Sequence, residues 1–167
     1  MRGRIELVLF ALALVCVAAI ALPLARCGGD ARRPAVEERW RPLREDDPRE
    51  VSEEMVRRYF TYDGDFRAWQ HRVLELATDP LRSRVAAMQP DPTMVAYEIT
   101  VRVLQVETRS LHRQGDAAEA TVRARARAVP GAPGGEWSAP RETERTILVE
   151  LRRQDGRWHV AEMRYLD

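Results

Sequence analysis

The chain opens with a short charged flank, after which residues 7–25 form an unbroken apolar stretch (LVLFALALVCVAAIALPLA). These 19 residues carry no charge. As a helix they would extend roughly 28 Å, close to the ~30 Å thickness of the hydrocarbon core of a bilayer. The apolar region of a cleaved secretory signal is shorter, about 7–15 residues. We therefore expect an uncleaved transmembrane signal-anchor over residues 1–27, with the span itself at 7–25.

Two other interpretations of this segment stay open. Residues 19–21 (Ala-Ile-Ala) fit the small-x-small pattern of a signal cleavage site. Residues 24–27 (Leu-Ala-Arg-Cys) resemble the processing site of a lipoprotein, although Arg26 occupies a position where a small residue is expected. The basic residues on the two sides of the stretch do not favour a C-terminus outside the cytoplasm. The short N-terminal flank, which is typical of a signal-anchor, is the reason why we expect an extracytoplasmic domain.

Residues 28–47 are rich in glycine, proline and charge and show no core pattern, so we expect a linker there and a folded domain over residues 48–167. A helix should begin at Pro48, because Asp47 can cap it and proline suits the first helical position. A second helix should begin at Phe66, and a third should follow a capping sequence at 78–80. Each helix has one apolar stripe at three- or four-residue spacing. The stripes consist of Val51, Met55, Tyr59 and Tyr62, of Trp69, Val73, Leu76 and Ala77, and of Leu81, Val85 and Met88.

From Thr93 onward the apolar positions recur at every second residue, which indicates strands. The first strand should run from Thr93 to His112, with a bulge near Leu104 or Gln105 where the apolar positions change phase. After a turn at 115–116, the second strand alternates small residues with charged ones, and two more strands complete a meander. The pattern predicts an α+β domain in which three helices pack on a curved four-stranded antiparallel sheet.

The last hairpin turns at residues 155–156 (Asp-Gly). A two-residue turn would pair Gln154 with Arg157 and place the apolar row of the third strand opposite charged residues. Because burial favours apolar partners, we expect a register shifted by one residue and a three-residue loop with Gly156 in the left-handed conformation. In that register the row of Ile147, Val149 and Leu151 faces Tyr165, Met163 and Ala161.

Composition narrows the range of functions. The formal net charge is only +1, and a general nucleic-acid binder needs a clear basic excess, so we expect no nucleic-acid partner. Both cysteines, Cys16 and Cys27, lie in or directly after the apolar stretch. The expected domain is therefore free of cysteine, which excludes disulfides, cysteine-ligated zinc and a thiol nucleophile there.

Two groups of side chains are candidates for binding. Tyr59, Tyr62, Trp69 and Tyr97 are candidates to line an apolar pocket between helices and sheet, although at helical or strand spacing such residues more often form a plain core. Arg123, Arg125 and Arg127 form a row on one face of the second strand, and Trp137 lies in the long loop of 130–140. This second group is a candidate partner surface. The simpler interpretation of the row, which we favour, is cross-strand pairing with Glu142 and Glu144.

No catalytic machinery is visible. The three histidines, His71, His112 and His159, have no partner at metal-ligand spacing, so no metal is expected. Asp63 and Asp65 could form a carboxylate pair, but a turn that ends a helix uses the same residues. No serine lies in a nucleophile elbow, and there is neither a P-loop nor a dinucleotide-binding glycine motif, so we expect no cofactor and no catalytic residue.

Several short stretches look like those of a known group of proteins. They are residues 59–63 (YFTYD), Trp69, residues 76–81 (LATDPL) and residues 155–160 (DGRWHV). The chain resembles, over 48–167, the membrane-anchored members of the NTF2-like superfamily in actinobacteria. These include conjugation proteins similar to VirB8 and TcpC, and Mce-associated membrane proteins. The resemblance implies a cone-shaped domain in which the sheet wraps around the helices.

The resemblance also implies a function. It favours a non-enzymatic accessory or assembly component of a secretion, conjugation or transport system, bound to protein partners or to further copies of itself. One alternative is a domain that holds a lipid or another apolar small molecule in the cone. A third interpretation, an enzyme similar to SnoaL or ketosteroid isomerase, would need an acid or base group in the cone, and the sequence identifies none.

Overall fold

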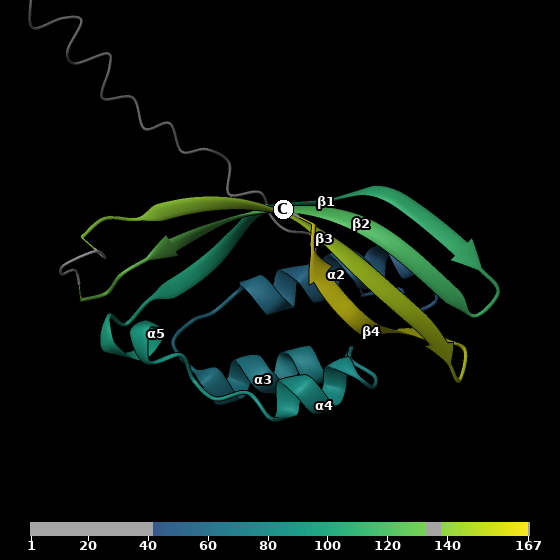
Figure 1. The fold of residues 1–167 in the computed structure, drawn as a ribbon, viewed down its shortest axis with the longest axis horizontal. Coiled ribbons are helices and arrows are strands. Elements are labelled where there is room, and N and C mark those ends of the chain that lie inside the picture. The colour runs from purple at the N-terminus through teal and green to yellow at the C-terminus, as the bar shows by residue number, and fades with distance from the viewer. Residues whose placement is uncertain (1–41, 133–137, 167) are drawn as a thin grey trace, which may run out of the picture. The chain divides into compact units, whose positions relative to one another are not determined.

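The computed structural model describes residues 42–132 and 138–166. The expected membrane span at 7–25 and the loop residue Trp137 lie outside these ranges. Within them, no helix is both long and apolar enough to span a bilayer. The elements follow one another as α2 (Pro48–Phe60), α3 (Phe66–Leu74), α4 (Leu81–Ala86), α5 (Pro92–Ala96), β1 (Thr100–Gln114), β2 (Ala117–Val129), β3 (Arg141–Gln154) and β4 (Arg157–Tyr165) (Figure 1).

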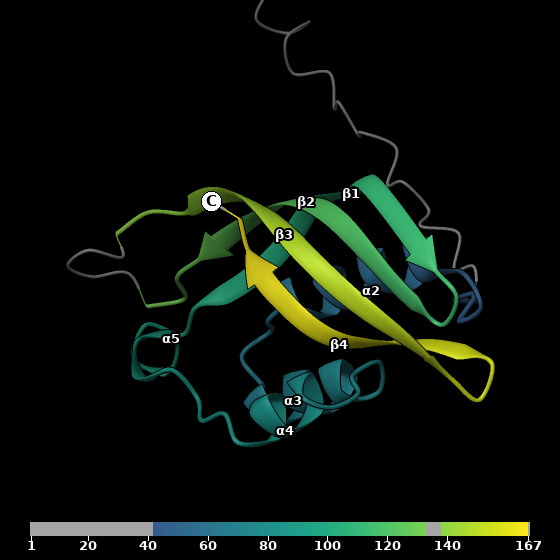
Figure 2. The same cartoon turned by 45° about the vertical axis from the view of Figure 1, so that its right-hand side comes forward.

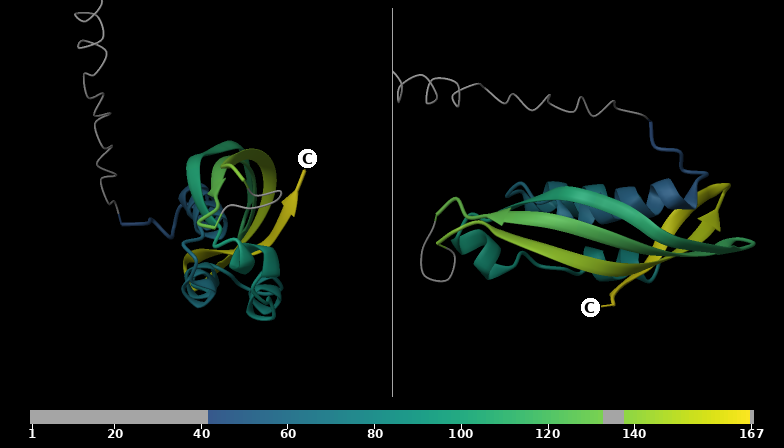
Figure 3. Two further views of the ribbon diagram at one scale, coloured as in Figure 1. Left: turned by 90° about the vertical axis from the view of Figure 1, so that its left-hand side faces the viewer. Right: turned by 90° about the horizontal axis from the view of Figure 1, so that it is seen from above.

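The four strands form one antiparallel sheet in the order β1-β2-β3-β4. The sheet curves over the helices, with α2 directly beneath it and α3 and α4 farther from it (Figures 1 and 2). Figure 3 shows the same curvature from the end of the sheet. The expected α+β architecture is confirmed, and α5 is a fourth, short helix that the sequence pattern did not predict.

The helix starts follow local capping chemistry. The side chain of Asp47 accepts a hydrogen bond from the backbone N–H of Arg49 at 2.9 Å, and Pro48 occupies the first turn of α2. Asp65 caps α3 in the same way, by accepting from the backbone N–H of Ala68 at 3.0 Å. Such caps satisfy backbone donors that have no partner inside the helix.

The core lies between the helices and the concave face of the sheet. Alternate residues of β2 point into it, and the largest side chains that are fully buried include Met55, Leu81, Ile147 and Trp158. Small alanines on the inner face of β2 leave room for α2 to approach the sheet. Burying each large apolar side chain stabilises the fold by about 1.5–3 kcal/mol.

The expected start of the first strand at Thr93 is wrong. Residues Pro92–Ala96 form α5, capped by Asp91, whose carboxylate accepts from the backbone N–H of Thr93 at 2.7 Å. Glu98 then adopts a positive φ of 49°, and β1 begins at Thr100. An aspartate–proline cap, the same signal that starts α2, prevails over the alternating apolar pattern.

The expected bulge in β1 is confirmed, since the register with β2 shifts between Val103 and Gln105. A second shift lies between Thr108 and Ser110. Here α2 supplies the missing partners: the carboxylate of Glu53 accepts from the backbone N–H of Thr108 at 3.0 Å, and Arg49 donates to the Thr108 carbonyl at 3.1 Å. The irregular backbone of the second bulge is therefore hydrogen-bonded to helix side chains.

The last hairpin forms two of the three expected apolar pairs, whereas Leu151 faces Val160 instead of Ala161. The three-residue loop is wrong: Gln154 pairs with Arg157, and the two-residue turn has positive φ at both Asp155 (50°) and Gly156 (82°). The pairing shifts further along, where Glu150 faces Glu162 but the next residue, Leu151, faces Val160. Ala161 is the extra residue of this bulge, and both Val160 and Ala161 are buried. Val149 then faces Met163, and Ile147 faces Tyr165, as expected.

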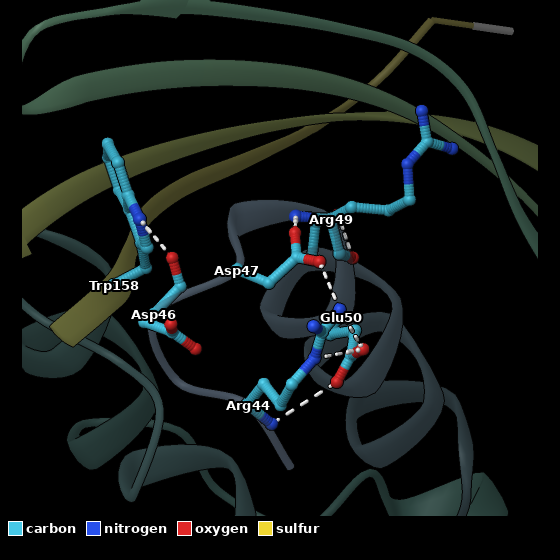
Figure 4. A network of polar contacts seen from close by, with 7 residues as sticks. Arg44, Asp46, Asp47, Arg49, Glu50 and Trp158 are labelled. Atoms are coloured by element: carbon cyan, nitrogen blue, oxygen red, sulfur yellow. Dashed lines mark hydrogen bonds and ion pairs between the residues drawn. The ribbon is translucent and has the colours of Figure 1, made fainter.

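The compact unit that contains the domain begins at Pro42, six residues before the expected boundary at residue 48. The segment from Pro42 to Asp47 packs on the last hairpin: the backbone N–H of Trp158 donates to the Glu45 carbonyl at 2.7 Å, and its indole N–H donates to the Asp46 carbonyl at 3.1 Å (Figure 4). Arg44 adds ion pairs with Asp47 and Glu50. This part of the expected linker is thus tied to the fold.

Candidate functional site

An aromatic row runs along one side of the domain from α3 to the end of β4. Phe66 packs on Trp69 with ring centroids 5.4 Å apart, and Trp69 meets Tyr59 edge-to-face at 5.6 Å. Tyr59 in turn contacts Phe60 at 5.5 Å, and Phe60 contacts Tyr165 at 6.3 Å. Edge-to-face contacts of this kind stabilise a cluster beyond the area that they bury.

Part of this row lines a cleft of about 350 Å³ between α2, α3, α5 and the start of β1. The lining includes aromatic rings from the two longer helices, α2 and α3, and the flexible side chains of Met88 and Met94. Asp91 is the only charged residue in the lining. Its carboxylate is already used to cap α5. The lining consists of Tyr59, Phe60, Tyr62, Phe66, Trp69, Met88, Gln89, Asp91, Met94 and Val101.

Three of the four residues expected to line a pocket, Tyr59, Tyr62 and Trp69, lie along this cleft, whereas Tyr97 does not. Tyr97 is the C-cap residue of α5, so it does not belong to the first strand as the sequence pattern predicted. The same helix brings in Met94, which the sequence interpretation missed. The Asp-Pro cap at 91–92 is the signal that would have revealed it.

Hydrogen bonds fix the polar ends of the aromatic side chains. The Trp69 indole N–H donates to the Tyr59 carbonyl at 2.9 Å, and the Tyr62 hydroxyl donates to the Gly64 carbonyl at 3.2 Å. Burial raises the pKa of the Tyr59 phenol, and the nearby charge of Arg84 lowers it to a smaller extent. The cleft therefore favours the neutral phenol and presents a largely apolar wall.

The arginine row of β2 lies on the convex face of the sheet. Arg125 forms an ion pair with Glu142 at 2.5 Å, and Arg123 forms one with Glu144. The pairs run diagonally, because the register places Arg125 opposite Glu144 and Arg127 opposite Glu142. Cross-strand pairing is thus the main use of Arg123 and Arg125. In the described residues Arg127 makes no ion pair.

The other chemical candidates are engaged in structural contacts. Asp63 contacts Arg72 at 3.3 Å, a hydrogen bond that lowers the pKa of the Asp63 carboxyl, while Asp65 caps α3. His71 lies 3.3 Å from Glu75 on an exposed helix face, and no histidine lines the cleft. Across 42–132 and 138–166, no three histidine, cysteine or acidic side chains gather in a way that could hold a metal ion.

No protein-family model matches this chain, and no curated protein matches it. Among solved structures, an NTF2-like protein involved in plasmid conjugation is similar over 70% of this chain, with a TM-score of 0.53 and 15% identity. The fold is NTF2-like. This chain spans 46% of the length of that conjugation protein.

Two further structures are similar at lower scores. The VirB8 protein of Agrobacterium tumefaciens matches 69% of this chain and 86% of its own, with a TM-score of 0.49 and 13% identity. The intermembrane-space region of the chloroplast protein ARC6 matches 72% of this chain and 97% of its own, with a TM-score of 0.48 and 14% identity. The actinobacterial and membrane-anchored features of the expected relatives stay predictions.

Within this NTF2-like domain, the cleft is a concave surface with a mostly apolar lining. Its lining residues provide aromatic faces, methionine side chains that can adapt to an occupant, and few polar groups that would fix the orientation of a small substrate. Such an arrangement can bind an apolar group.

Proposed function

We propose that this chain is a non-enzymatic, membrane-anchored accessory component of a secretion, conjugation or transport assembly, and that its NTF2-like domain binds protein partners. The observation that carries the proposal is the open cleft lined by aromatic and methionine side chains. Surfaces of this composition accept apolar side chains of other proteins, because aromatic rings supply contact area and methionine adapts its shape. The likeness to a conjugation protein suggests the type of assembly.

The proposal includes an anchor of the chain in the membrane. The uncharged stretch at 7–25 is long enough to cross a bilayer and is our proposed anchor in the cell membrane. In this proposal the domain lies outside the cytoplasm, where components of a transport assembly would meet it. Protease treatment of intact spheroplasts tests this arrangement: digestion of the domain is expected, and full protection would overturn it.

A pair of neighbouring substitutions on α5 tests whether the cleft binds partner proteins. Met94 lines the cleft, whereas Val95 is 59% exposed and does not. We expect Met94→Lys to abolish co-purification of partner proteins from gently solubilised membranes, because a charge would enter the apolar cleft, and Val95→Lys to leave the complex intact. Recovery of the unaltered chain alone, without any partner, would contradict the proposed function.

A second candidate function is the binding of a lipid or another apolar small molecule. The cleft volume of about 350 Å³ favours it, since ligand sites commonly span about 300–1,000 Å³. Native mass spectrometry of the purified chain distinguishes the two functions. A bound molecule that is lost in Met94→Lys and kept in Val95→Lys would support the small-molecule site, whereas loss of protein partners alone would support the assembly component.

A further inference from the structure

The cleft between α2, α3, α5 and the start of β1 combines aromatic rings with a single carboxylate. Five of its ten lining residues are aromatic, and its one charged residue is Asp91. No basic residue belongs to this lining. A lining that is apolar and negatively charged suits an occupant that is apolar along most of its length and positively charged at one place.

The fold does not neutralise the charge of Asp91. Its Oδ1 atom accepts a hydrogen bond from the backbone N–H of Thr93 at 2.7 Å, which is a neutral donor. Within 42–132 and 138–166, no basic side chain pairs with this carboxylate, and no hydrogen bond reaches its second oxygen, Oδ2. An ionised carboxylate can accept about four hydrogen bonds. Asp91 can therefore still accept from a cationic donor that enters the cleft.

Charges next to the cleft act in the same direction. Burial raises the pKa of the Tyr62 phenol, and the negative charge of Asp65, the next largest cause, raises it further. Arg84 acts on the other phenol of the lining, but Arg84 is itself paired with Glu162 at 2.6 Å. The nearby positive charge is thus compensated, and the field in the cleft favours a cation.

The aromatic lining attracts cations as well as apolar groups. A cation over the face of a ring is attracted by the negative charge of that face, most strongly where water is excluded. The rings of Phe66 and Trp69 lie with their centroids 5.4 Å apart, and the indole N–H of Trp69 is bound to the Tyr59 carbonyl at 2.9 Å. Because the fold already holds these rings, little side-chain freedom is lost when an occupant binds.

We propose that the cleft binds an arginine side chain of a partner protein, with apolar residues on both sides of that arginine. The inference rests on the proposed function and defines the partner by its chemistry. A guanidinium group is planar and weakly hydrated, stacks on aromatic rings and can donate to Oδ2 of Asp91. The cleft volume of about 350 Å³ also leaves room for apolar neighbours of the arginine.

Other cations fit the lining less well. The ammonium group of lysine is strongly hydrated and loses more when it leaves water. A quaternary ammonium group, such as the head group of a choline lipid, is attracted by aromatic rings but has no N–H to donate to Asp91. The open acceptor in the lining therefore favours arginine over both.

A matched pair of labelled peptides, added to the full-length chain in mild detergent, tests the inference. Both peptides have blocked ends and leucine on each side of the central residue, which is arginine in one and citrulline in the other. Citrulline is close to arginine in shape but carries no charge. Fluorescence anisotropy should show at least about ten-fold tighter binding of the arginine peptide. Equal binding of the two, or no binding of either up to about 1 mM, overturns the inference.

Two aspartate substitutions test the role of the carboxylate. Asparagine caps a helix about as well as aspartate, so Asp91→Asn removes the charge and keeps the start of α5. The preference for arginine over citrulline should fall about ten-fold. Asp79→Asn is the matched control, because Asp79 accepts from the backbone N–H of Ser83 at 3.2 Å but lies outside the cleft lining. An unchanged preference in Asp91→Asn, or an equal loss in both variants, overturns the inference.

A substitution in the lining tests the aromatic rings. Phe66 is half-buried, so Phe66→Leu keeps an apolar side chain without emptying the core. It should weaken binding of the arginine peptide about three-fold more than binding of the citrulline peptide. Equal weakening of the two peptides would overturn the inference that the rings bind a cation.

Two further outcomes separate this inference from the proposed function. If partner proteins are lost with Met94→Lys but co-purify equally with Asp91→Asn and with the unaltered chain, the proposed function stands and the inference of an arginine is overturned. If tetramethylammonium displaces the arginine peptide at a lower concentration than blocked arginine does, the cleft selects a quaternary ammonium group, which also overturns the inference.

Discussion

The indole N–H of Trp158 donates a hydrogen bond to the backbone carbonyl of Asp46 at 3.1 Å, across 112 residues of sequence. Trp158 is fully buried, and its own backbone N–H binds the Glu45 carbonyl. The segment that leads into α2 is therefore fastened to the last hairpin by one side chain and its backbone.

Trp158→Phe should lower the free energy of unfolding by about 1–3 kcal/mol, because it removes the indole hydrogen bond and leaves a cavity. Urea denaturation followed by far-ultraviolet circular dichroism measures the loss. Arg157→Ala is the control, since it removes only the exposed ion pair with Glu45, and its cost should stay below about 1 kcal/mol. A larger effect of Arg157→Ala than of Trp158→Phe would contradict the role of the indole.

Glu53→Ala should destabilise the domain by about 1–3 kcal/mol, because it leaves the buried backbone N–H of Thr108 without an acceptor. Glu53→Gln keeps an acceptor oxygen and should cost clearly less. Thermal unfolding of the two variants under the same conditions gives the comparison. Identical losses would show that the charge of Glu53, rather than the hydrogen bond at the β1 bulge, matters.

Alkaline stability should depend on Tyr59. Burial raises the pKa of its phenol in the folded chain above the ordinary value of 10.0. The stabilisation that results is fully present below the unfolded pKa and is lost as the pH rises through the folded pKa, because the unfolded chain gains the tyrosinate first. Tyr59→Phe should therefore lose less stability than the unaltered chain on going from about pH 9 to about pH 11. Urea unfolding at both pH values measures this difference, and parallel losses would refute it.

Gly156→Ala should cost about 1–2 kcal/mol, because Gly156 has a φ of 82° and a side chain is strained in that conformation. Asp155→Asn is the matched control in the same turn. Asparagine suits the positive φ of 50° at that position, so this variant should remain as stable as the unaltered chain. Thermal unfolding compares the two variants, and an unchanged melting temperature for Gly156→Ala would contradict the observed turn.

The sequence by itself determined the features that depend on near neighbours. Asp47-Pro48 and Asp65-Phe66 specify where α2 and α3 begin, because a cap needs only a side-chain acceptor and the N–H groups two or three residues later. The alternation in β2 specifies which side of that strand is buried, because successive side chains point to opposite faces. The candidate cleft was predicted only in part, through Tyr59, Tyr62 and Trp69, which line it.

The tertiary structure alone decided how distant segments meet. Burial of both Val160 and Ala161 is achieved by a bulge inside β4, because the preferred two-residue turn at Asp155-Gly156 is kept and the sheet absorbs the extra residue. Likewise, no local pattern indicates that Phe60 meets Tyr165. Local chemistry fixes caps and faces, whereas registers and clefts depend on the packing of elements that lie far apart in the chain.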